Sequence, residues 1–343
     1  MWRVGSAGLL RRLPLLLLAA CLPLLQACGP AQPGRWSVDL AWRTAIAVAG
    51  QPEHETGPLA LAAGDATLVL ADSFAHRLLI WRASGATWQG PTRVTLPTSQ
   101  PIIQVAAGPA AGAPVYAATA SGGIWEVGDG SAPRRLARFA GGSGDLRRVV
   151  GMVAGARGLW VEVVSVRADA TTRELAAVDT SGVRLLQRAV LASAGPARDI
   201  PPAWLYSPAG VRISLAVGPQ GSYWLVGRDP HGAPALLRLG PAGAPDARRR
   251  WPEDLSRADF LGVAPSGMGY VLVDAGSERQ HLESLTPRGT VRRARAFPAG
   301  EGPRLPHPAA MAPDGALAVL TALPGALRID WYPPKAVWGG TSG

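Results

Sequence analysis

Short apolar strands separated by Gly/Pro turns recur along this chain, and that repeat restricts its fold more than any other feature. Each copy opens with an apolar strand, a turn and a second apolar strand, at intervals of about 44 to 63 residues. From Trp36 onward no segment shows a sustained helical apolar stripe, so the pattern predicts an all-β protein. The turns that mark the copies lie near Gly64, Gly108, Gly155, Gly218, Pro265 and Pro313.

A period of this length with about four strands per copy is typical of propeller blades and too long for solenoid coils. Six copies predict a six-bladed β-propeller with four-stranded antiparallel blades. The last copy supplies only three strands, whereas Trp36–Ile46 alternates apolar and polar residues before the first copy. We expect this N-terminal strand to close the last blade, because closure removes two exposed sheet edges. Ser193–Gly210 is expected to be an inter-blade insertion.

The first copy also carries a recognisable motif. Val69–Trp81 reads as an apolar strand, Ala-Asp-Ser, a short turn, His-Arg and a second apolar strand. It resembles an NHL-type propeller repeat, and Val271–Arg279 is a fainter echo. The resemblance implies that Asp72, His76 and Arg77 hold the turn. Other members of this broad class bind proteins, carbohydrate or RNA, and a few are hydrolases, lyases or quinone-dependent dehydrogenases.

The first 29 residues have the pattern of an export leader, with arginines, then an apolar stretch, then Leu25-Gln26-Ala27-Cys28-Gly29. This ending resembles a bacterial lipobox, which implies acylation of Cys28 and anchoring by more than one acyl chain, each buried methylene contributing about 0.8 kcal/mol. Cys21, which follows Leu18-Ala19-Ala20, is the alternative site. An ordinary cleaved signal and an uncleaved anchor helix remain alternatives for the leader. The expected organisation is a signal peptide over 1–27, a tether over 28–35, the propeller over 36–338 and a tail over 339–343.

The positions of the cysteines and the distribution of charge restrict the kinds of site and partner that the folded part can have. Both cysteines lie in the leader, so the folded part has no disulfide, cysteine nucleophile or thiolate metal site. The formal charge is +10. Lys335 is the only lysine. The arginine pairs and triplets are short and scattered along the sequence, and we therefore expect no nucleic-acid partner. The same arginine, alanine, glycine and proline bias is typical of a GC-rich genome.

Chemistry-bearing residues are few and widely separated. The loops of a propeller converge at the ends of its channel, so distant residues can still form one site. The candidates are His54, Glu55, Asp72, Glu126, Glu162, Asp229, His231 and Asp274. Three or more carboxylates converging within 2.3 to 2.6 Å of one point would make a calcium-dependent, lactonase-like site. Solvated loops and turn caps are the competing interpretation for each residue. Neither a nucleophile elbow nor a phosphate-binding glycine loop is present.

Tryptophan is frequent, at 12 residues in the chain. Trp81, Trp125, Trp160 and Trp224 fall inside expected strands and should act as wedges between blades. Another four lie near loops, where an exposed ring could stack on a sugar or hold a partner. These four are Trp88, Trp204, Trp251 and Trp338.

Together these features predict a lipid-anchored propeller on the extracytoplasmic side of a cell membrane or outer membrane. We expect it to bind or assemble with a protein or a cell-envelope polymer, with no catalytic residue and no cofactor assigned. The alternative is a calcium-dependent lactonase or lyase with its site at the channel mouth. The membrane itself is the one partner that the leader implies, through the lipid on Cys28.

Overall fold

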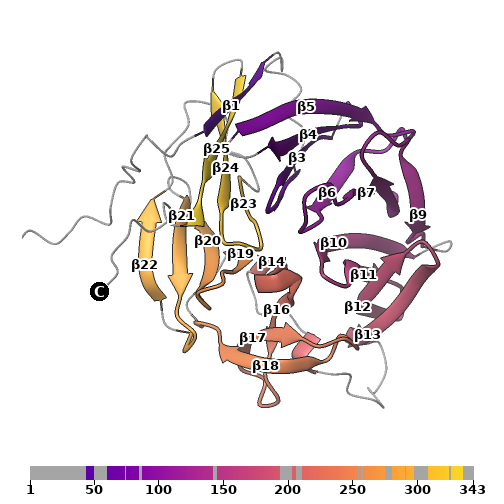
Figure 1. Cartoon of the computed structure of the whole chain (residues 1–343). Helices are drawn as coiled ribbons and strands as arrows, with labels where there is room; N and C mark the ends of the chain where they lie inside the picture. The colour runs from indigo at the N-terminus through magenta and orange to yellow at the C-terminus, as the bar shows by residue number, and fades with distance from the viewer. Residues whose placement is uncertain are drawn as a thin grey trace, which may run out of the picture.

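The computed structural model describes residues 44–49, 60–73, 75–84, 87–141, 145–193, 203–205, 211–253, 255, 258–274, 280–289, 291–296, 308–323 and 326–334. Its elements are β-strands and two short 3-10 helices, η2 (Ala203–Leu205) and η3 (Pro219–Gly221). The strands form six sheets arranged around a central axis, as Figure 1 shows. The all-β, six-bladed propeller expected from the repeats is confirmed.

The first three blades are four-stranded antiparallel sheets that follow one another along the chain. Blade 1 contains β2 (Ala60–Gly64), β3 (Thr67–Asp72), β4 (Arg77–Ser84) and β5 (Thr87–Thr95). Blade 2 contains β6 (Ile102–Ala107), β7 (Val115–Thr119), β8 (Gly123–Val127) and β9 (Arg134–Arg138). Blade 3 contains β10 (Leu146–Gly155), β11 (Gly158–Val166), β12 (Ala170–Asp179) and β13 (Gly182–Ser193).

The other three blades complete the ring. Blade 4 contains β15 (Leu215–Val217), β16 (Tyr223–Arg228), β17 (Pro234–Leu239) and β18 (Pro245–Arg250). Blade 5 contains β19 (Ala258–Val263), β20 (Gly269–Asp274), β21 (Gln280–Leu285) and β22 (Val291–Ala296). Blade 6 contains β23 (Ala309–Met311), β24 (Leu317–Leu323), β25 (Ala326–Tyr332) and, from the other end of the chain, β1 (Thr44–Ala49).

Blade 5 departs from the expected four strands. A fifth strand, β14 (Val211–Ile213), pairs in parallel with β19 at the inner edge of that sheet. It lies directly after the insertion expected over Ser193–Gly210, and at Ser214 the chain leaves blade 5 and enters β15 of blade 4. The insertion therefore delivers the chain to the inner edge of two neighbouring blades, which the repeat pattern did not predict.

The ring is closed as expected, although with different bounds. β1 pairs antiparallel with β25, from Thr44 opposite Trp331 to Ala49 opposite Ala326. The strand predicted over Trp36–Ile46 is thus confirmed in its role at its last three residues and continues to Ala49, whereas residues 36–43 lie outside the described residues. Residues 1–43, with the leader, the tether and Cys28, lie outside the described residues. Among the helices of the described part, none has the length and apolar character to cross a membrane.

The hydrophobic core lies between the blades. Six clusters of buried side chains are found in the described residues, and each joins two neighbouring sheets. Because inner strands are covered on both faces, β3 is buried at every position. β5, at the outer edge of the same blade, is mostly exposed. This gradient from axis to rim explains why the apolar runs of the sequence are the first two strands of each copy.

The turns between the first and second strands meet at one end of the channel. A Cβ atom on Gly64 would overlap the carbonyl oxygen of Gly108, so only glycine permits the close approach of blades 1 and 2. The backbone N–H of Ala156 donates to the carbonyl of Gly221 across blades 3 and 4, at 2.9 Å. The turn residues that marked the repeats therefore also join adjacent blades.

Candidate functional site

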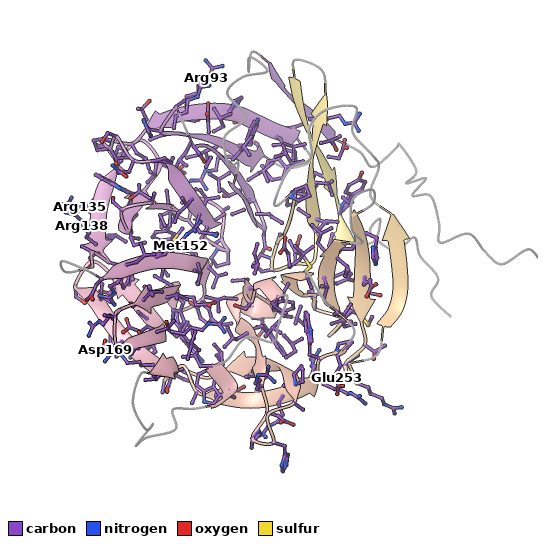
Figure 2. The ribbon with its side chains drawn as sticks, turned by 180° about the vertical axis from the view of Figure 1, so that it is seen from behind. Arg93, Arg135, Arg138, Met152, Asp169 and Glu253 are labelled. Carbon is purple, nitrogen blue, oxygen red and sulfur yellow. The ribbon has the colours of Figure 1, made fainter. Side chains whose placement is uncertain are left out.

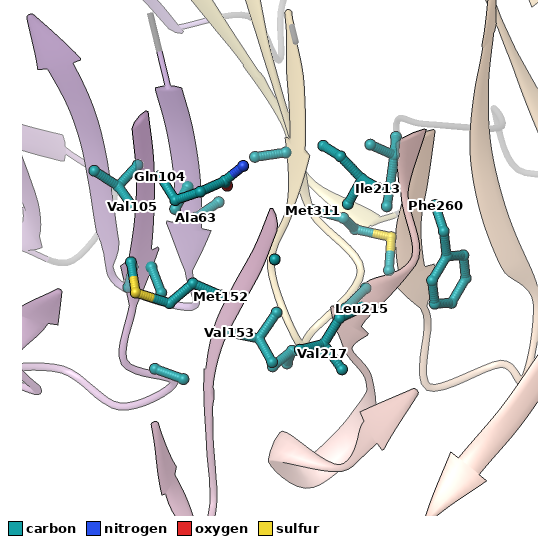
Figure 3. A pocket seen from close by; sticks show the side chains of 18 of the residues that line it. Ala63, Gln104, Val105, Met152, Val153, Ile213, Leu215, Val217, Phe260 and Met311 are labelled. Carbon is teal, nitrogen blue, oxygen red and sulfur yellow. The ribbon is translucent and has the colours of Figure 1, made fainter. Parts of the chain in front are cut away.

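The innermost strands of the blades enclose a cavity of about 100 Å³ on the axis of the ring. Its wall is formed by residues of β2, β6, β10, β14, β15, β19 and β23, and Figure 3 shows their side chains around it. The wall is apolar, with Met152, Met311, Ile213 and Phe260 among its larger side chains, and Gln104 is the one polar side chain among the described residues that line it. Such a wall favours exclusion of ions and offers no acid or base.

The calcium site considered from the sequence would need several oxygen ligands around one point. Among the described residues no group of three or more His, Cys, Asp or Glu side chains gathers in a way that could hold a metal. His54 and Glu55 lie outside the described residues, and so does the side chain of Asp274. The candidates that are described lie apart from one another, and none is among the residues that line the axial cavity, although the Glu162 carboxylate lies directly behind Gly151 of its wall.

Asp72 holds the turn of blade 1, as the NHL resemblance implies. Its carboxylate, on a residue only 1% exposed, accepts from Nε of Arg77 at 2.8 Å and from the backbone N–H of Ala75 at 3.4 Å. His76 has a positive φ of 52°, and its Nδ1 lies 3.1 Å from the carbonyl oxygen of Gln100. The side chains of Asp72, Arg77 and His76 thus all form contacts within the turn or with the neighbouring loop.

Two other candidates are engaged in local contacts. Glu126 of β8 forms an ion pair with Arg134 of β9 at 2.6 Å. Asp229 follows β16, and its Oδ1 accepts from the backbone N–H groups of His231 at 2.8 Å and Ala233 at 2.9 Å. This is an Asx-type turn, in which the aspartate shapes the hairpin. The side chain of His231 forms no ion pair among the described residues.

Glu162 is the one candidate that is buried together with a charged partner. Nε of Arg173 donates to its Oε1 at 2.5 Å, and the hydroxyl of Ser214 donates to its Oε2 at 2.7 Å. The remaining arginine nitrogens donate to the hydroxyl of Ser214 at 2.6 Å and to the carbonyl of Leu205 at 2.7 Å. The network joins blade 3 to η2 and to the point where β14 ends. Its position indicates an architectural role in holding the insertion.

A surface that the sequence reasoning missed lies at the end of blade 3. The strands of blade 3 are 9 to 12 residues long, whereas those of blade 2 are 5 to 6. Because the β10–β11 turn lies with the equivalent turns of the other blades, the extra length extends from the opposite end of the ring. There Leu146 pairs with Val166, and these side chains are 65% and 42% exposed. The long run of β-branched residues in β11 was the sequence signal that could have indicated this extension.

We call Asp145, Leu146, Val166 and Arg167 the blade 3 tip. Asp145 and Arg167 flank the apolar pair and form an ion pair at 3.2 Å. The tip lies at the end of the ring where the second strand of each blade connects to the third. The turns of Asp72 and Asp229 lie at this same end.

The tryptophans mostly serve the core. Trp81, Trp160 and Trp224 are buried between blades, and Trp125 is partly buried there, so the expected wedges are confirmed. The expectation of exposed rings near loops is wrong for Trp251, which is 1% exposed and packs edge-on against Phe260. Trp88 and Trp204 are partly buried, and Trp338 lies outside the described residues.

At the opposite end of the ring, two acidic turns meet. The backbone N–H of Asp314, in blade 6, donates to Oδ1 of Asp65, in blade 1, at 2.9 Å. Burial raises the pKa of Asp65, and the nearby Asp314 carboxylate raises it further, while the hydrogen bond opposes both effects. Burial also raises the pKa of Asp314. Ionising this pair therefore costs the folded state free energy at neutral pH.

We predict that Asp65→Asn stabilises the protein at pH 7 and not in acid. The native pKa of Asp65 lies above the unfolded value, so the native state loses stability as pH rises through that window. Asparagine keeps the acceptor and removes the charge; the gain should be below about 1 kcal/mol for so exposed a group. Urea unfolding at pH 7 and pH 4 measures it, the gain shrinking at the lower pH.

Asp179→Asn is the matched control with the opposite sign. Hydrogen bonds from the hydroxyl and backbone N–H of Ser181 lower the pKa of Asp179, so its ionised form stabilises the native state at pH 7. This variant should lose stability at pH 7. A stability gain from Asp179→Asn, or none from Asp65→Asn, would contradict the assigned electrostatics.

Comparison with known proteins finds structural matches at low sequence identity. No family model and no curated protein matches the chain. Among solved structures, a streptogramin B lyase has 12% identity and a TM-score of 0.47, covering 84% of this chain and 98% of that one. A calcium-binding protein, regucalcin from Agrobacterium tumefaciens, has 13% identity and a TM-score of 0.48, covering 83% and 95%. The WD40 propeller domain of Doa1 has 12% identity and a TM-score of 0.43, covering 83% and 95%. Because similarity is so low, no activity is carried over from them.

Proposed function

We propose that this protein is a lipid-anchored, extracytoplasmic β-propeller that binds a partner protein of the cell envelope. The observation that carries the proposal is where the candidate residues lie in the fold. The channel wall is apolar, and the described acidic candidates are each held in a turn, an ion pair or a buried network. In its described part, such a propeller presents surfaces that can bind a partner and no assembled set of reactive groups.

The blade 3 tip is the surface we assign to the partner. It combines two exposed apolar side chains with a flanking ion pair on strands that extend beyond the neighbouring blade. Protein interfaces bury an apolar centre within a polar rim, and the tip has this composition on a small scale. It also lies on a rigid sheet, so the ordering cost of binding is low.

The experiment compares capture of a cross-linked envelope partner by the wild-type chain and by two variants. The double variant Leu146→Asp and Val166→Asp places charge in the apolar centre and should abolish capture. Leu185→Asp changes another exposed leucine, 47% exposed on β13, and should leave capture unchanged. Equal capture by all three proteins would contradict the assignment. One tightly bound calcium ion per full-length chain, with hydrolase or lyase activity lost on its removal, would instead establish the enzymatic alternative.

The anchor is proposed from the leader residues alone and has its own test. Cys28→Ala should abolish incorporation of labelled palmitate and release the protein from the membrane fraction, because the thiol is the acylated group. Cys21→Ala should leave both unchanged. Loss of label with Cys21→Ala and retention with Cys28→Ala would move the site to the alternative cysteine. Retention of membrane binding without label in either variant would indicate an uncleaved anchor helix.

A further inference from the structure

The outermost strand of five blades is rich in arginine. One arginine lies on β5, three on β9, two on β13, three on β18 and three on β22. Asp246 of β18 is the one acidic residue on these strands, although the chain has 24 Asp and Glu. The basic runs at 134–135, 248–250 and 292–293 are far apart in sequence, yet the fold places them at the same position in their blades.

Protection of sheet edges does not account for this distribution. Charged side chains on an edge strand prevent pairing with another sheet, and that purpose is served by either sign of charge. A GC-rich codon bias would raise arginine in every strand alike. Neither cause explains why the outer strands carry almost no acid while β8, β11 and β12 carry Glu126, Glu162 and Glu174.

Much of this charge is unpaired within the described part of the molecule. Arg134 and Arg188 form ion pairs with Glu126 and Glu174, at 2.6 and 2.8 Å. The other exposed arginines on β5, β9 and β13 form no ion pair with any described residue, and neither does Arg248 of β18. Figure 2 shows Arg93, Arg135 and Arg138 projecting from the rim of the ring. We call Arg93, Arg135, Arg138, Arg184 and Arg248 the rim arginines.

We propose that the rim binds a flexible polyanionic chain whose charges are phosphate groups, lying across the outer strands of successive blades. The planar guanidinium group donates two parallel hydrogen bonds to a phosphate, and this is the contact that each rim arginine would supply. The outer strands face different directions around the ring, as Figure 1 shows. A flat membrane or a stiff duplex could contact only one side of such a surface, whereas a flexible chain can follow it.

This surface is distinct from the blade 3 tip, so the inference goes beyond the proposed function and each can fail alone. The test uses the full-length chain in detergent and fluorescent linear inorganic polyphosphate as the probe. Binding is measured by anisotropy over a range of salt concentrations. The rim variant carries one glutamine on each of three blades: Arg93→Gln, Arg135→Gln and Arg248→Gln.

The matched control removes the same charge from exposed arginines that lie off the outer strands and outside the blade 3 tip: Arg148→Gln, Arg157→Gln and Arg288→Gln. We expect the rim variant to bind polyphosphate more weakly by at least about tenfold and its salt slope to fall by about 2, at about 0.7 per lost contact. The control should stay within about twofold of wild type. Thermal melting verifies that both variants fold.

Three outcomes would overturn the proposal. Equal weakening of the two variants would mean that only net charge matters. Tighter binding to phosphatidylglycerol vesicles than to polyphosphate would assign the rim to a membrane. Tighter binding to duplex DNA would assign it to nucleic acid, which the scattered sequence runs argued against.

Discussion

Arg173→Met should destabilise the protein by about 3 to 5 kcal/mol, the cost of leaving a buried charge without its partner. Arg173 and Glu162 are 4% and 2% exposed, and every donating nitrogen of the arginine is used. Methionine fills a similar volume but donates nothing, so the Glu162 carboxylate would remain buried with only the Ser214 hydroxyl. Part of the loss would come from the insertion, whose Leu205 carbonyl accepts from Arg173.

Urea unfolding followed by tryptophan fluorescence measures the loss. Arg188→Met is the control, because its ion pair with Glu174 lies in the same blade and its arginine is 56% exposed. Glu174 is buried but keeps Arg147 as a partner, and the Arg188 guanidinium is exposed, so the loss should be about 0 to 1 kcal/mol. The double variant Glu162→Leu and Arg173→Met should recover much of the stability, since no charge is left unpaired. Losses of equal size in Arg173→Met and Arg188→Met would show that the network contributes no more than a surface pair.

Trp160→Ala should cost a similar amount, about 3 to 5 kcal/mol, because it opens a cavity between blades 3 and 4. Trp160 is 1% exposed and stacks on Tyr223, with ring centroids 3.9 Å apart and planes 5° from parallel. The same cluster includes Leu175, Leu215 and Leu237 from the two blades. Removing the indole therefore separates surfaces on both sheets, and the two blades should lose cooperativity as well as stability.

Tyr223→Phe separates packing from hydrogen bonding at this position. The hydroxyl donates to the carbonyl of Gly158 at 2.7 Å and accepts from the backbone N–H of Arg157 at 3.1 Å. Burial raises its pKa to about 12, so it remains a donor throughout the stable pH range. Phenylalanine keeps the stack, and we expect a loss of about 1 to 3 kcal/mol. Calorimetry of both variants measures the two losses of stability. A larger loss for Tyr223→Phe than for Trp160→Ala would show that the hydrogen bonds of the hydroxyl, and not the packing of the indole, contribute most at this position.

The fold could be predicted because its determinants are local. Gly64, Gly108 and Gly155 mark turns whose chemistry is readable in a few residues, and their spacing predicts the number of blades. Closure followed from a missing fourth strand in the last copy. The described strand β1 continues to Ala49, beyond the predicted end at Ile46, because an alternating apolar pattern does not fix where a strand ends.

The candidate site could not be predicted to the same extent. Glu162 was one of eight candidates named from the sequence, but Arg173, Ser214 and Leu205 come from three separate segments that only the folded ring brings together. The rim arginines looked scattered because their common feature is a place in the blade, which a linear sequence hides. The change from blade 5 to blade 4 at Ser214 had no sequence signal, because a parallel strand of three residues is too short to leave a periodic pattern.

The strand that closes the ring has a mechanical consequence. Among the described residues, the chain enters the propeller at Thr44, and β1 is held to β25 by six residue pairs. A lipid anchor at Cys28 would apply force to the chain on the N-terminal side of this ladder. Forming the ladder joins the two ends of the described chain, at an entropic cost of about 5 kcal/mol. The last blade therefore closes the ring through the strand pairing that is most distant in sequence, and it is the blade that carries the N-terminal strand.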